Sequence, residues 1–237
     1  MTACTLLATI AVLVPLAAGC GSTSKKAAPL PHGTESVKLD PADFSAEIDN
    51  PYWPMRPGSK WVYREGSARV EVTVTDRTKK IIGIDARVVH DVLTENGKVK
   101  EDTFDWYAQD RRGNVWYLGE DTKAYENGKV STAGSWEAGV NGARAGKVMP
   151  AHPRAGMQYR QEYLAGEAED HARVLSLDDQ AEVPAGHYRN ALLTKEWTPL
   201  EPDGLEYKLY ARGVGQVLAL TVSGGWEREQ LISFHRG

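Results

Sequence analysis

Cysteine is nearly absent from this chain of 237 residues, which contains only Cys4 and Cys20. Both lie within the first twenty residues, so a domain built from the rest of the sequence has no thiol with which to form a disulfide. Small exported domains often depend on disulfides because their cores are too small to hold them folded. This chain must instead be held together by its apolar core.

Recognisable catalytic motifs are missing as well. The sequence has no Gly-x-Ser-x-Gly elbow, no His-Glu-x-x-His pattern, no Cys-x-x-Cys pair and no glycine loop of the kind that cradles phosphate. Carboxylates are plentiful, so a glycosidase-like acid/base pair stays open, although no spacing selects two of them. These absences favour a non-enzymatic protein without a cofactor.

No cluster of basic residues is present either. The formal net charge is −4 and both signs are mixed along the chain. Nucleic-acid-binding proteins usually carry a basic patch or an aromatic stripe with Arg, so we expect no nucleic-acid partner. The aromatic residues are instead seven Trp and ten Tyr against three Phe, a set that suits half-buried sheet faces and the rims of binding clefts.

The longest apolar run, Leu6 to Ala18, has 13 residues, whereas a membrane-spanning helix needs roughly 20. The run closes with Ala17, Ala18 and Gly19 directly before Cys20. A short apolar segment with a small-residue exit is typical of a signal peptide. The alternative is a buried N-terminal helix that happens to end in Gly-Cys.

This segment resembles the lipobox of bacterial lipoproteins. The resemblance implies cleavage before Cys20 and attachment of a diacylglycerol to its thiol, which makes residues 1–19 a signal peptide. One departure is that Met1 to Thr5 contains no Lys or Arg, which such leaders normally carry. The resemblance predicts an exported protein anchored through Cys20 to the outer face of the bacterial cell membrane, or to the outer membrane in a Gram-negative cell.

A tether is predicted to follow. Gly21 to Gly33 is rich in proline and in small, polar residues, which bury too little apolar surface to offset the entropy of ordering. Residues 20–38 are therefore predicted to be the lipidated cysteine and a flexible tether. No second linker follows, so residues 39–237 are predicted to form a single β domain.

From Trp61 onward, apolar residues recur with a period of two. Val70, Val72 and Val74 alternate with polar residues. The next segment is predicted to have one apolar face and one charged face. The apolar face is formed by Ile82, Ile84, Ala86, Val88 and Val92. The charged face is formed by Asp85, Arg87 and Asp91. This alternation is typical of antiparallel sheets with one covered side and one solvent-facing side.

Turn signals support the same fold. Asn96-Gly97 and Asn127-Gly128 predict hairpins, because a type I′ turn needs a positive φ at both central residues. Asp110 to Gly113 and Asp203-Gly204 mark further turns. About twelve short strands in meander order predict an all-β, mainly antiparallel fold, either a curved sheet or a barrel.

Helix is predicted only near the start of this domain. Asp40 is a suitable N-cap and Pro41 suits the first turn, so a single short helix is expected to run to about Ile48.

Four motifs carry a second resemblance: Asn50-Pro51-Tyr52-Trp53-Pro54, Pro57-Gly58-x-x-Trp61-x-Tyr63, Asp105-Trp106-Tyr107-Ala108-Gln109-Asp110 and Tyr210-Ala211-x-Gly213-Val214-Gly215-x-Val217. In combination they resemble a family of uncharacterised bacterial secreted proteins and lipoproteins, over most of the chain after the predicted signal peptide. The resemblance implies export and a fold similar to calycin-like barrels or half-barrels. It carries no assigned chemistry.

A long Gly-rich connection is the irregular part of the sequence. Ser131 to Gly156 shows little periodicity and has Trp136 and Met149 as its bulky members. Loops of this length are usually functional lids or unstructured. The connection is predicted to be either a strap over the barrel end, with Trp136 in the core, or a lid over a ligand.

Few side chains stand out as ligands. The most specific candidate set consists of Met149, His152 and Met157, because thioether and imidazole groups are suitable copper ligands. Methionine also commonly fills gaps in apolar cores. No metal site is therefore assigned. His90 is either a ligand contact or a hydrogen-bonded core histidine. Trp106 either lines a cavity or packs across strands.

Together these features predict a non-enzymatic, membrane-anchored β protein that binds a small apolar or amphipathic ligand in its barrel mouth. The candidate ligand-binding residues are Trp136, Met149, His152, Trp106 and His90. Two alternatives stay open: an envelope interaction or assembly module with a solid core, and a hydrolase of envelope glycans. A cavity would separate the binder from the module, and two carboxylates facing one another in a cleft would favour the hydrolase.

Overall fold

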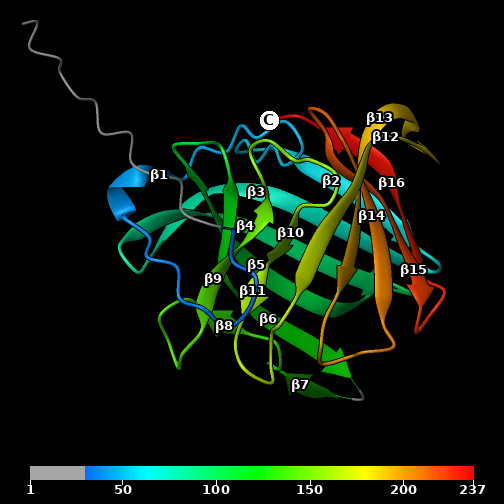
Figure 1. The fold of residues 1–237 in the computed structure, drawn as a ribbon. Helices are drawn as coiled ribbons and strands as arrows, with labels where there is room; N and C mark the ends of the chain where they lie inside the picture. The colour runs from blue at the N-terminus through cyan, green and yellow to red at the C-terminus, as the bar shows by residue number, and fades with distance from the viewer. Residues whose placement is uncertain (1–29, 127) are drawn as a thin grey trace, which may run out of the picture.

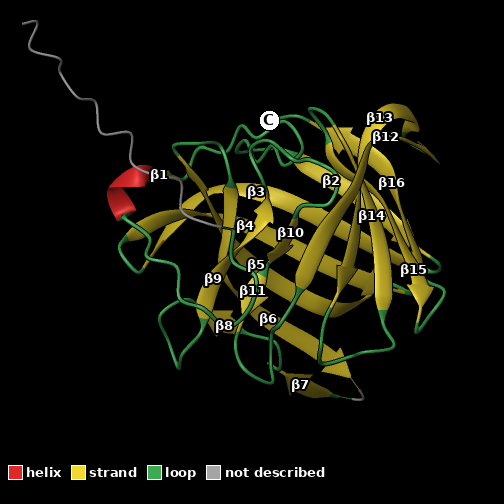
Figure 2. Cartoon of the chain, in the orientation of Figure 1, coloured by secondary structure: helices red, strands yellow, loops and turns green. Residues whose placement is uncertain are grey.

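The computed structural model describes residues 30–126 and 128–237 of the chain. The predicted signal peptide, Cys20 and most of the predicted tether lie outside these residues. Within the described ranges, the regular structure is β-strand apart from a single turn of 3₁₀ helix (Figures 1 and 2). The predicted all-β, antiparallel fold is confirmed.

The described residues form sixteen strands. The strands of the first half are β1 (Phe44–Ser45), β2 (Lys60–Glu65), β3 (Ala68–Ile81), β4 (Ile84–Glu95), β5 (Lys98–Asp110), β6 (Val115–Glu126), β7 (Lys129–Ser131), β8 (Trp136–Glu137) and β9 (Arg144–Met149). The second half contains β10 (Gln158–Arg160), β11 (Glu162–Tyr163), β12 (His171–Val183), β13 (Gly186–Trp197), β14 (Leu205–Ala211), β15 (Gly215–Ser223) and β16 (Arg228–His235).

One continuous hydrogen-bonded path joins most of these strands, in the order β10-β12-β13-β14-β15-β16-β2-β3-β4-β5-β6-β9-β11. The last strand of the chain, β16, pairs with β2, so that Phe234 lies opposite Trp61. The sheet curls until its later strands lie in front of its earlier ones (Figure 1). The result is a nearly closed antiparallel barrel.

Residues 158–163 bring the two ends of this path together. The first three form β10 and pair with β12, whereas Glu162 and Tyr163 form β11 and pair with β9. A Cβ built at Gly146 of β9 would lie only 2.2 Å from the carbonyl oxygen of Gln161. Glycine is therefore required where β9 meets this closing segment.

One of the two predicted Asn-Gly turns can be compared with the structure, because Asn127 of the other lies outside the described residues. Asn96 and Gly97 have φ of 50° and 74°, which confirms the predicted hairpin turn between β4 and β5. Ile82 and Gly83 form a second turn of this kind, with φ of 44° and 85°. The prediction that Ile82 belongs to the apolar face of a strand is therefore wrong, because Gly83 allows the chain to reverse there.

The N-terminal helix is shorter than predicted. Asp40 caps it as expected, its side chain accepting from the N–H of Ala42 at 3.2 Å, and Pro41 occupies the first turn. The helix ends at Asp43 rather than near Ile48, because the next two residues form β1 and pair with β5.

The Gly-rich connection from Ser131 to Gly156 is not one loop. It contains β8 and β9, and β9 is buried along nearly its whole length and pairs with β6. This strand was missed because Gly146 interrupts the apolar alternation by which strands are identified.

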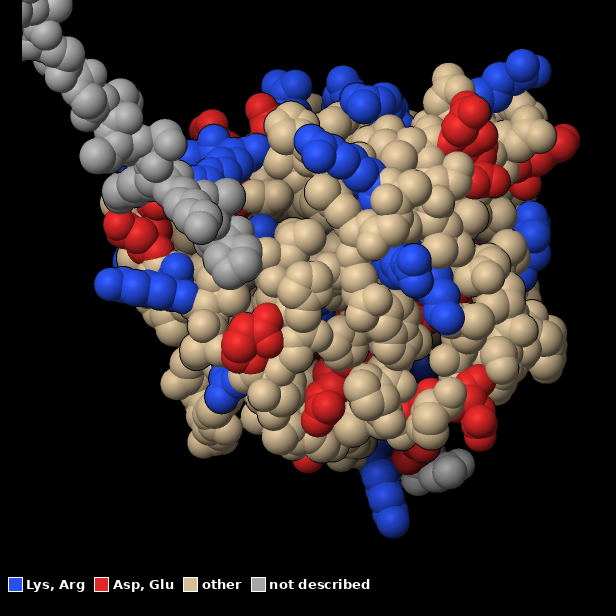
Figure 3. All heavy atoms as spheres, in the orientation of Figure 1, with Lys and Arg blue, Asp and Glu red and all other residues tan. Residues whose placement is uncertain are grey.

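The molecular surface carries charges of both signs. Acidic and basic side chains are interspersed on the face drawn in Figure 3, with several Lys and Arg along its upper edge. Trp226, between β15 and β16, is 86 % exposed. In residues 30–126 and 128–237, no helix has the length and apolar character needed to cross a membrane.

Candidate functional site

A cavity of about 130 Å³ lies within the barrel. Its walls come from six strands that are neighbours in the sheet, β15, β16, β2, β3, β4 and β5, and from residues 53–55, which precede β2. Because most of the lining stands on hydrogen-bonded strands, the shape of the cavity is fixed by the barrel rather than by loops.

Aromatic side chains form one part of the lining: Trp53, Trp61, Tyr63 and Tyr107. Trp61 donates from Nε1 to the carbonyl oxygen of Val214 at 2.7 Å, and the hydroxyl of Tyr63 donates to that of Gln216 at 3.0 Å. The polar ends of these two side chains are thus engaged with backbone at the start of β15. What they offer to the cavity is ring surface.

Trp53 belongs to the segment between β1 and β2. Its ring centroid lies 5.6 Å from that of Tyr107 and 5.8 Å from that of Tyr210. Its indole N–H is buried and has no acceptor among the described residues. A buried donor without a partner is uncommon, because an unmade hydrogen bond costs free energy.

The segment that carries Trp53 separates the cavity from the outside. Asn50 anchors it by donating from Nδ2 to the carbonyl oxygens of Gly113 at 2.8 Å and Pro150 at 3.2 Å. Pro54 and Met55 line both the cavity and an outer groove of about 1050 Å³. The segment is therefore the wall between the two spaces.

Carboxyl groups form the other part of the lining: Asp91, Asp105 and Glu229. The carboxyl of Asp91 forms no hydrogen bond or ion pair with any residue in the described part of the chain. Burial raises the pKa of Asp91 well above its usual value, and the nearby Asp105 and Glu229 raise it further. Asp91 is half-buried and lines the cavity.

The prediction that Asp91 lies on a solvent-facing side of its strand is wrong. Val89 and Asp91 share the face of β4 that lines the cavity, and the opposite face is also covered, since Ala86 and Val88 are buried. In a barrel both sides of a strand can be covered. The alternation of side chains along a strand then shows which residues share a face, but it does not show which face points into the barrel.

A tyrosine connects Asp105 to a further carboxyl in the interior, that of Glu120. The hydroxyl of Tyr117 lies 2.5 Å from Oδ1 of Asp105 and 3.1 Å from Oε2 of Glu120. Burial raises the pKa of Asp105 to about 6 and that of Glu120 to about 8. The Tyr117 hydroxyl thus donates toward both carboxyl groups, and Thr122 donates to the same oxygen of Glu120 at 3.1 Å.

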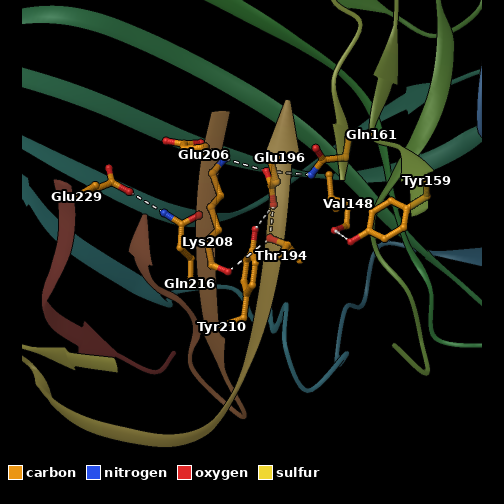
Figure 4. Close-up of polar contacts among 10 residues, drawn as sticks. All are labelled: Val148, Tyr159, Gln161, Thr194, Glu196, Glu206, Lys208, Tyr210, Gln216 and Glu229. Carbon is orange, nitrogen blue, oxygen red and sulfur yellow. Dashed lines mark hydrogen bonds and ion pairs between the residues drawn. The ribbon is translucent and has the colours of Figure 1, made fainter. Parts of the chain in front are cut away.

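Glu229 is the carboxyl of this group that comes from the C-terminal strand. It accepts from Nε2 of Gln216 at 2.6 Å (Figure 4). Burial raises the pKa of Glu229 to about 7, although Lys208 opposes the shift. Asp91 and Glu229 thus approach the cavity from β4 and β16, on either side of β2 and β3 in the sheet.

A different arrangement surrounds Glu196 on β13. Nζ of Lys208 lies 3.0 Å from Oε2 of Glu196 and 3.1 Å from Oε2 of Glu206 (Figure 4). Thr194 and Tyr210 donate to the other oxygen of Glu196 at 2.7 and 3.0 Å. Burial disfavours the charge on Glu196, but Lys208 and these hydrogen bonds outweigh it and hold the pKa of Glu196 below its usual value.

The interior therefore contains two unlike acidic regions. Glu196 is neutralised by Lys208, whereas no Lys or Arg among the described residues forms an ion pair with Asp91, Asp105 or Glu229. Across the same residues, no three His, Cys, Asp or Glu side chains are grouped so that they could hold a metal ion. The cavity is thus lined by aromatic rings and by three carboxyl groups without an ion pair, of which Asp105 and Glu229 accept hydrogen bonds and the carboxyl of Asp91 accepts none.

The predicted ligand-binding residues lie elsewhere, since none of the five lines this cavity. Trp136 is buried and donates from Nε1 to Oε2 of Glu162 at 2.9 Å. Met149 is fully buried in β9 while His152 is exposed. These two side chains therefore do not present a common surface to a soft metal.

Trp106 and His90 are both engaged in packing. Nζ of Lys79 lies 3.3 Å from the ring centroid of Trp106, which alternates along β5 with the cavity-lining Asp105 and Tyr107. Nε2 of His90 lies 2.9 Å from Oδ1 of Asp102, and its ring stacks on Phe104. A ligand-binding role for the five residues stays a prediction.

Sequence reasoning missed Trp53, Asp91 and Glu229 as cavity residues. Trp53 offered a signal, because an aromatic pair between two prolines is a stiff segment suited to covering an opening. Asp91 and Glu229 offered none, since nothing local distinguishes a carboxylate that faces the interior from one that faces solvent.

Comparison with known proteins assigns no chemistry to this chain. No family model matches the chain, and no curated protein sequence matches it. A protein from Bacteroides fragilis NCTC 9343 that is predicted to be exported and has a YmcC-like fold superposes with a TM-score of 0.46 at 14% identity, over 78% of this chain and 99% of the other. A predicted lipoprotein from Parabacteroides distasonis ATCC 8503 gives a TM-score of 0.46 at 12% identity, over 78% and 98%.

Proposed function

We propose that this is an exported, lipid-anchored cell-envelope protein that binds a small amphipathic ligand inside its barrel without converting it. The observation that carries the proposal is the cavity of about 130 Å³, which combines four aromatic rings with three carboxyl groups. Enclosed pockets that are mainly apolar and hold a few polar groups are the usual form of small-molecule sites.

The size of the cavity limits the ligand. Pockets for drug-sized molecules measure roughly 300–1,000 Å³, and an engineered cavity of about 150 Å³ accepts benzene. The cavity therefore suits a compact ligand or the head group of a longer one. The outer groove of about 1050 Å³ beyond Pro54 and Met55 has room for an attached chain.

Export and anchoring rest on the start of the chain. The apolar run before Cys20 is too short to span a membrane, and the small residues around the proposed cleavage point fit a lipoprotein leader. A diacylglycerol on Cys20 would hold the barrel at the outer face of a membrane through the tether.

The two alternatives differ in their support. An interaction or assembly module is favoured by Trp226, which is 86 % exposed. Glycan hydrolysis has less support, because Asp105 and Glu120 share one tyrosine inside the barrel instead of facing one another across an open cleft.

Native mass spectrometry of the protein, purified gently from a bacterial host, tests ligand binding directly. We expect a retained mass of a few hundred daltons or less that is lost on denaturation. The control is a variant with Val89→Trp, in which the larger side chain fills the cavity and the retained mass should disappear. A clean apo mass for the wild-type protein would favour the interaction module.

A further inference from the structure

We propose that the ligand of this cavity is a small organic ammonium ion, held by Asp91 and Glu229 against the rings of Trp53 and Trp61. This rests on the proposed ligand-binding function and names the chemical class that the cavity selects.

Charge is the first reason. Elsewhere in the barrel a buried carboxylate has its cation, since Lys208 lies 3.0 Å from Glu196. At the cavity no cationic side chain of the described residues forms an ion pair with Asp91 or Glu229, and the Asp91 carboxyl accepts no hydrogen bond, although Gln216 donates to Glu229 and Lys208 favours its charge. A buried charge without a partner is costly, so these carboxyls retain protons when no cation is bound, and a cation can take the place of a proton.

The rings are the second reason. Aromatic faces attract ammonium groups, and the attraction strengthens when the cation is removed from water. The indole N–H of Trp61 is bonded to Val214 and its ring stacks on Phe234 at 4.9 Å, so the part of the ring that lines the cavity is its remaining surface. Carboxylates beside aromatic rings are the usual surroundings of a bound organic cation.

Size and hydrogen bonding narrow the class further. No three metal-binding side chains in the described ranges are grouped for a bare metal ion, and about 130 Å³ is far more space than such an ion fills. An ammonium ion with five to seven heavy atoms is comparable in size to benzene. A hydroxyl or ether oxygen on the same ion would also supply the acceptor that the buried Nε1 of Trp53 lacks.

Binding should then compete with protons. The charged groups facing Asp91 are Asp105, Glu101, Glu120 and Glu229, and those facing Glu229 from the neighbouring strands are Lys208, Glu65 and Glu206. Apart from Lys208 all are acidic, and burial raises the pKa of Glu229 to about 7. A cation that enters at lower pH must displace a proton, so affinity should rise with pH.

Two pairs of probes test the charge requirement. Choline is compared with 3,3-dimethylbutan-1-ol, in which carbon replaces the nitrogen, and tert-butylammonium is compared with tert-butanol. Binding to the full chain carrying Cys20→Ser is measured at pH 8 by titration calorimetry and by the intrinsic fluorescence of its seven tryptophans, which include Trp53 and Trp61. Phosphate buffer replaces Tris, which is itself an ammonium ion.

We expect at least one cation to bind tenfold or more tightly than its neutral partner. For choline, which does not titrate, the affinity should rise about tenfold per pH unit between pH 5 and 7, as one displaced proton requires. The variant Asp91→Asn should lower cation affinity at least tenfold. The matched control Asp121→Asn, an exposed position on β6, should leave it unchanged.

Stability separates a binding role from a structural one. Asp91→Asn removes an unpaired buried carboxyl, so its melting temperature at pH 8 should equal or exceed that of the wild-type protein while cation binding is lost. A lower melting temperature together with unchanged binding would overturn the assignment of Asp91.

The outcomes distinguish the two proposals. Equal binding of the cations and their neutral partners would leave a ligand cavity but refute its preference for ammonium. Absence of binding by all four probes, together with an apo mass for the wild-type protein, would refute both.

Discussion

The ammonium nitrogen of Lys208 lies 3.0 Å from Oε2 of Glu196 inside the barrel. Burial alone would lower the pKa of Lys208, but Glu196 and Glu206 hold it well above its usual value. Each group therefore keeps the other charged. This pair is the reference against which the unpaired carboxyls of the cavity can be judged.

Replacing Lys208 should expose the cost of an unpaired carboxylate. We expect Lys208→Met to lower the free energy of unfolding by about 3 kcal/mol at pH 7, because Glu196 would remain buried without its cation. Urea denaturation measures the change, and the exposed Lys123→Met on β6 serves as the control. Adding Glu196→Gln should recover most of the loss. A failure to recover would show that Lys208 stabilises the barrel by packing instead.

Glu120 should make the protein less stable as pH rises. Its pKa is about 8 in the folded protein against an ordinary value of 4.5. Between these values the folded chain keeps a proton that the unfolded chain has released, so the free energy of unfolding falls as pH rises. Glu120→Gln removes this dependence and should stabilise the protein by on the order of 2 kcal/mol at pH 8.5, with little effect at pH 4.5.

Thermal unfolding of both forms across pH 4.5–8.5 measures this difference. The exposed Glu126→Gln on the same strand is the control and should follow the wild-type curve. Parallel curves for Glu120→Gln and the wild-type protein would contradict the raised pKa of Glu120.

How far the sequence predicts this molecule depends on whether a feature is local. The turn at Asn96-Gly97 and the cap at Asp40 involve neighbouring residues, and both were predicted correctly. Strand β9 was missed because Gly146 is required by a contact with residues 158–163, which are not adjacent to it in sequence. The inward direction of Asp91 was missed because closure of the barrel, not local alternation, decides which face is inside.

Gly146 should tolerate no side chain. In Gly146→Ala the new Cβ would lie 2.2 Å from the carbonyl oxygen of Gln161, a backbone atom that cannot turn aside. We expect a loss of about 3 kcal/mol, at the upper end for overpacking, and measure it by chemical denaturation.

Gly142 in the same connection is a matched control. Its φ is 85° and nothing lies within 4 Å of a built Cβ, so Gly142→Ala carries only backbone strain. That strain should cost about 1 kcal/mol. Equal losses for the two variants would mean that the contact with residue 161 does not limit closure.

Cys20 should carry the lipid. Growing cells with a palmitate analogue should label the wild-type protein, and Cys20→Ser should abolish the label because no other cysteine remains after residues 1–19 are removed. Cys4→Ser is the control and should label normally. Label that survives in Cys20→Ser would refute the lipoprotein assignment.

The pairing of β16 with β2 also sets the order in which the barrel can form. Lys60 lies opposite His235 in that ladder, so the first long strand meets its partner only when the final residues of the chain exist. Until then one edge of β2 has no hydrogen-bonded partner strand. The strands that follow β2 can form hairpins, but the barrel cannot close. Since contacts between residues so distant in sequence form late, we expect folding to be slow and to finish only after the whole chain has been released.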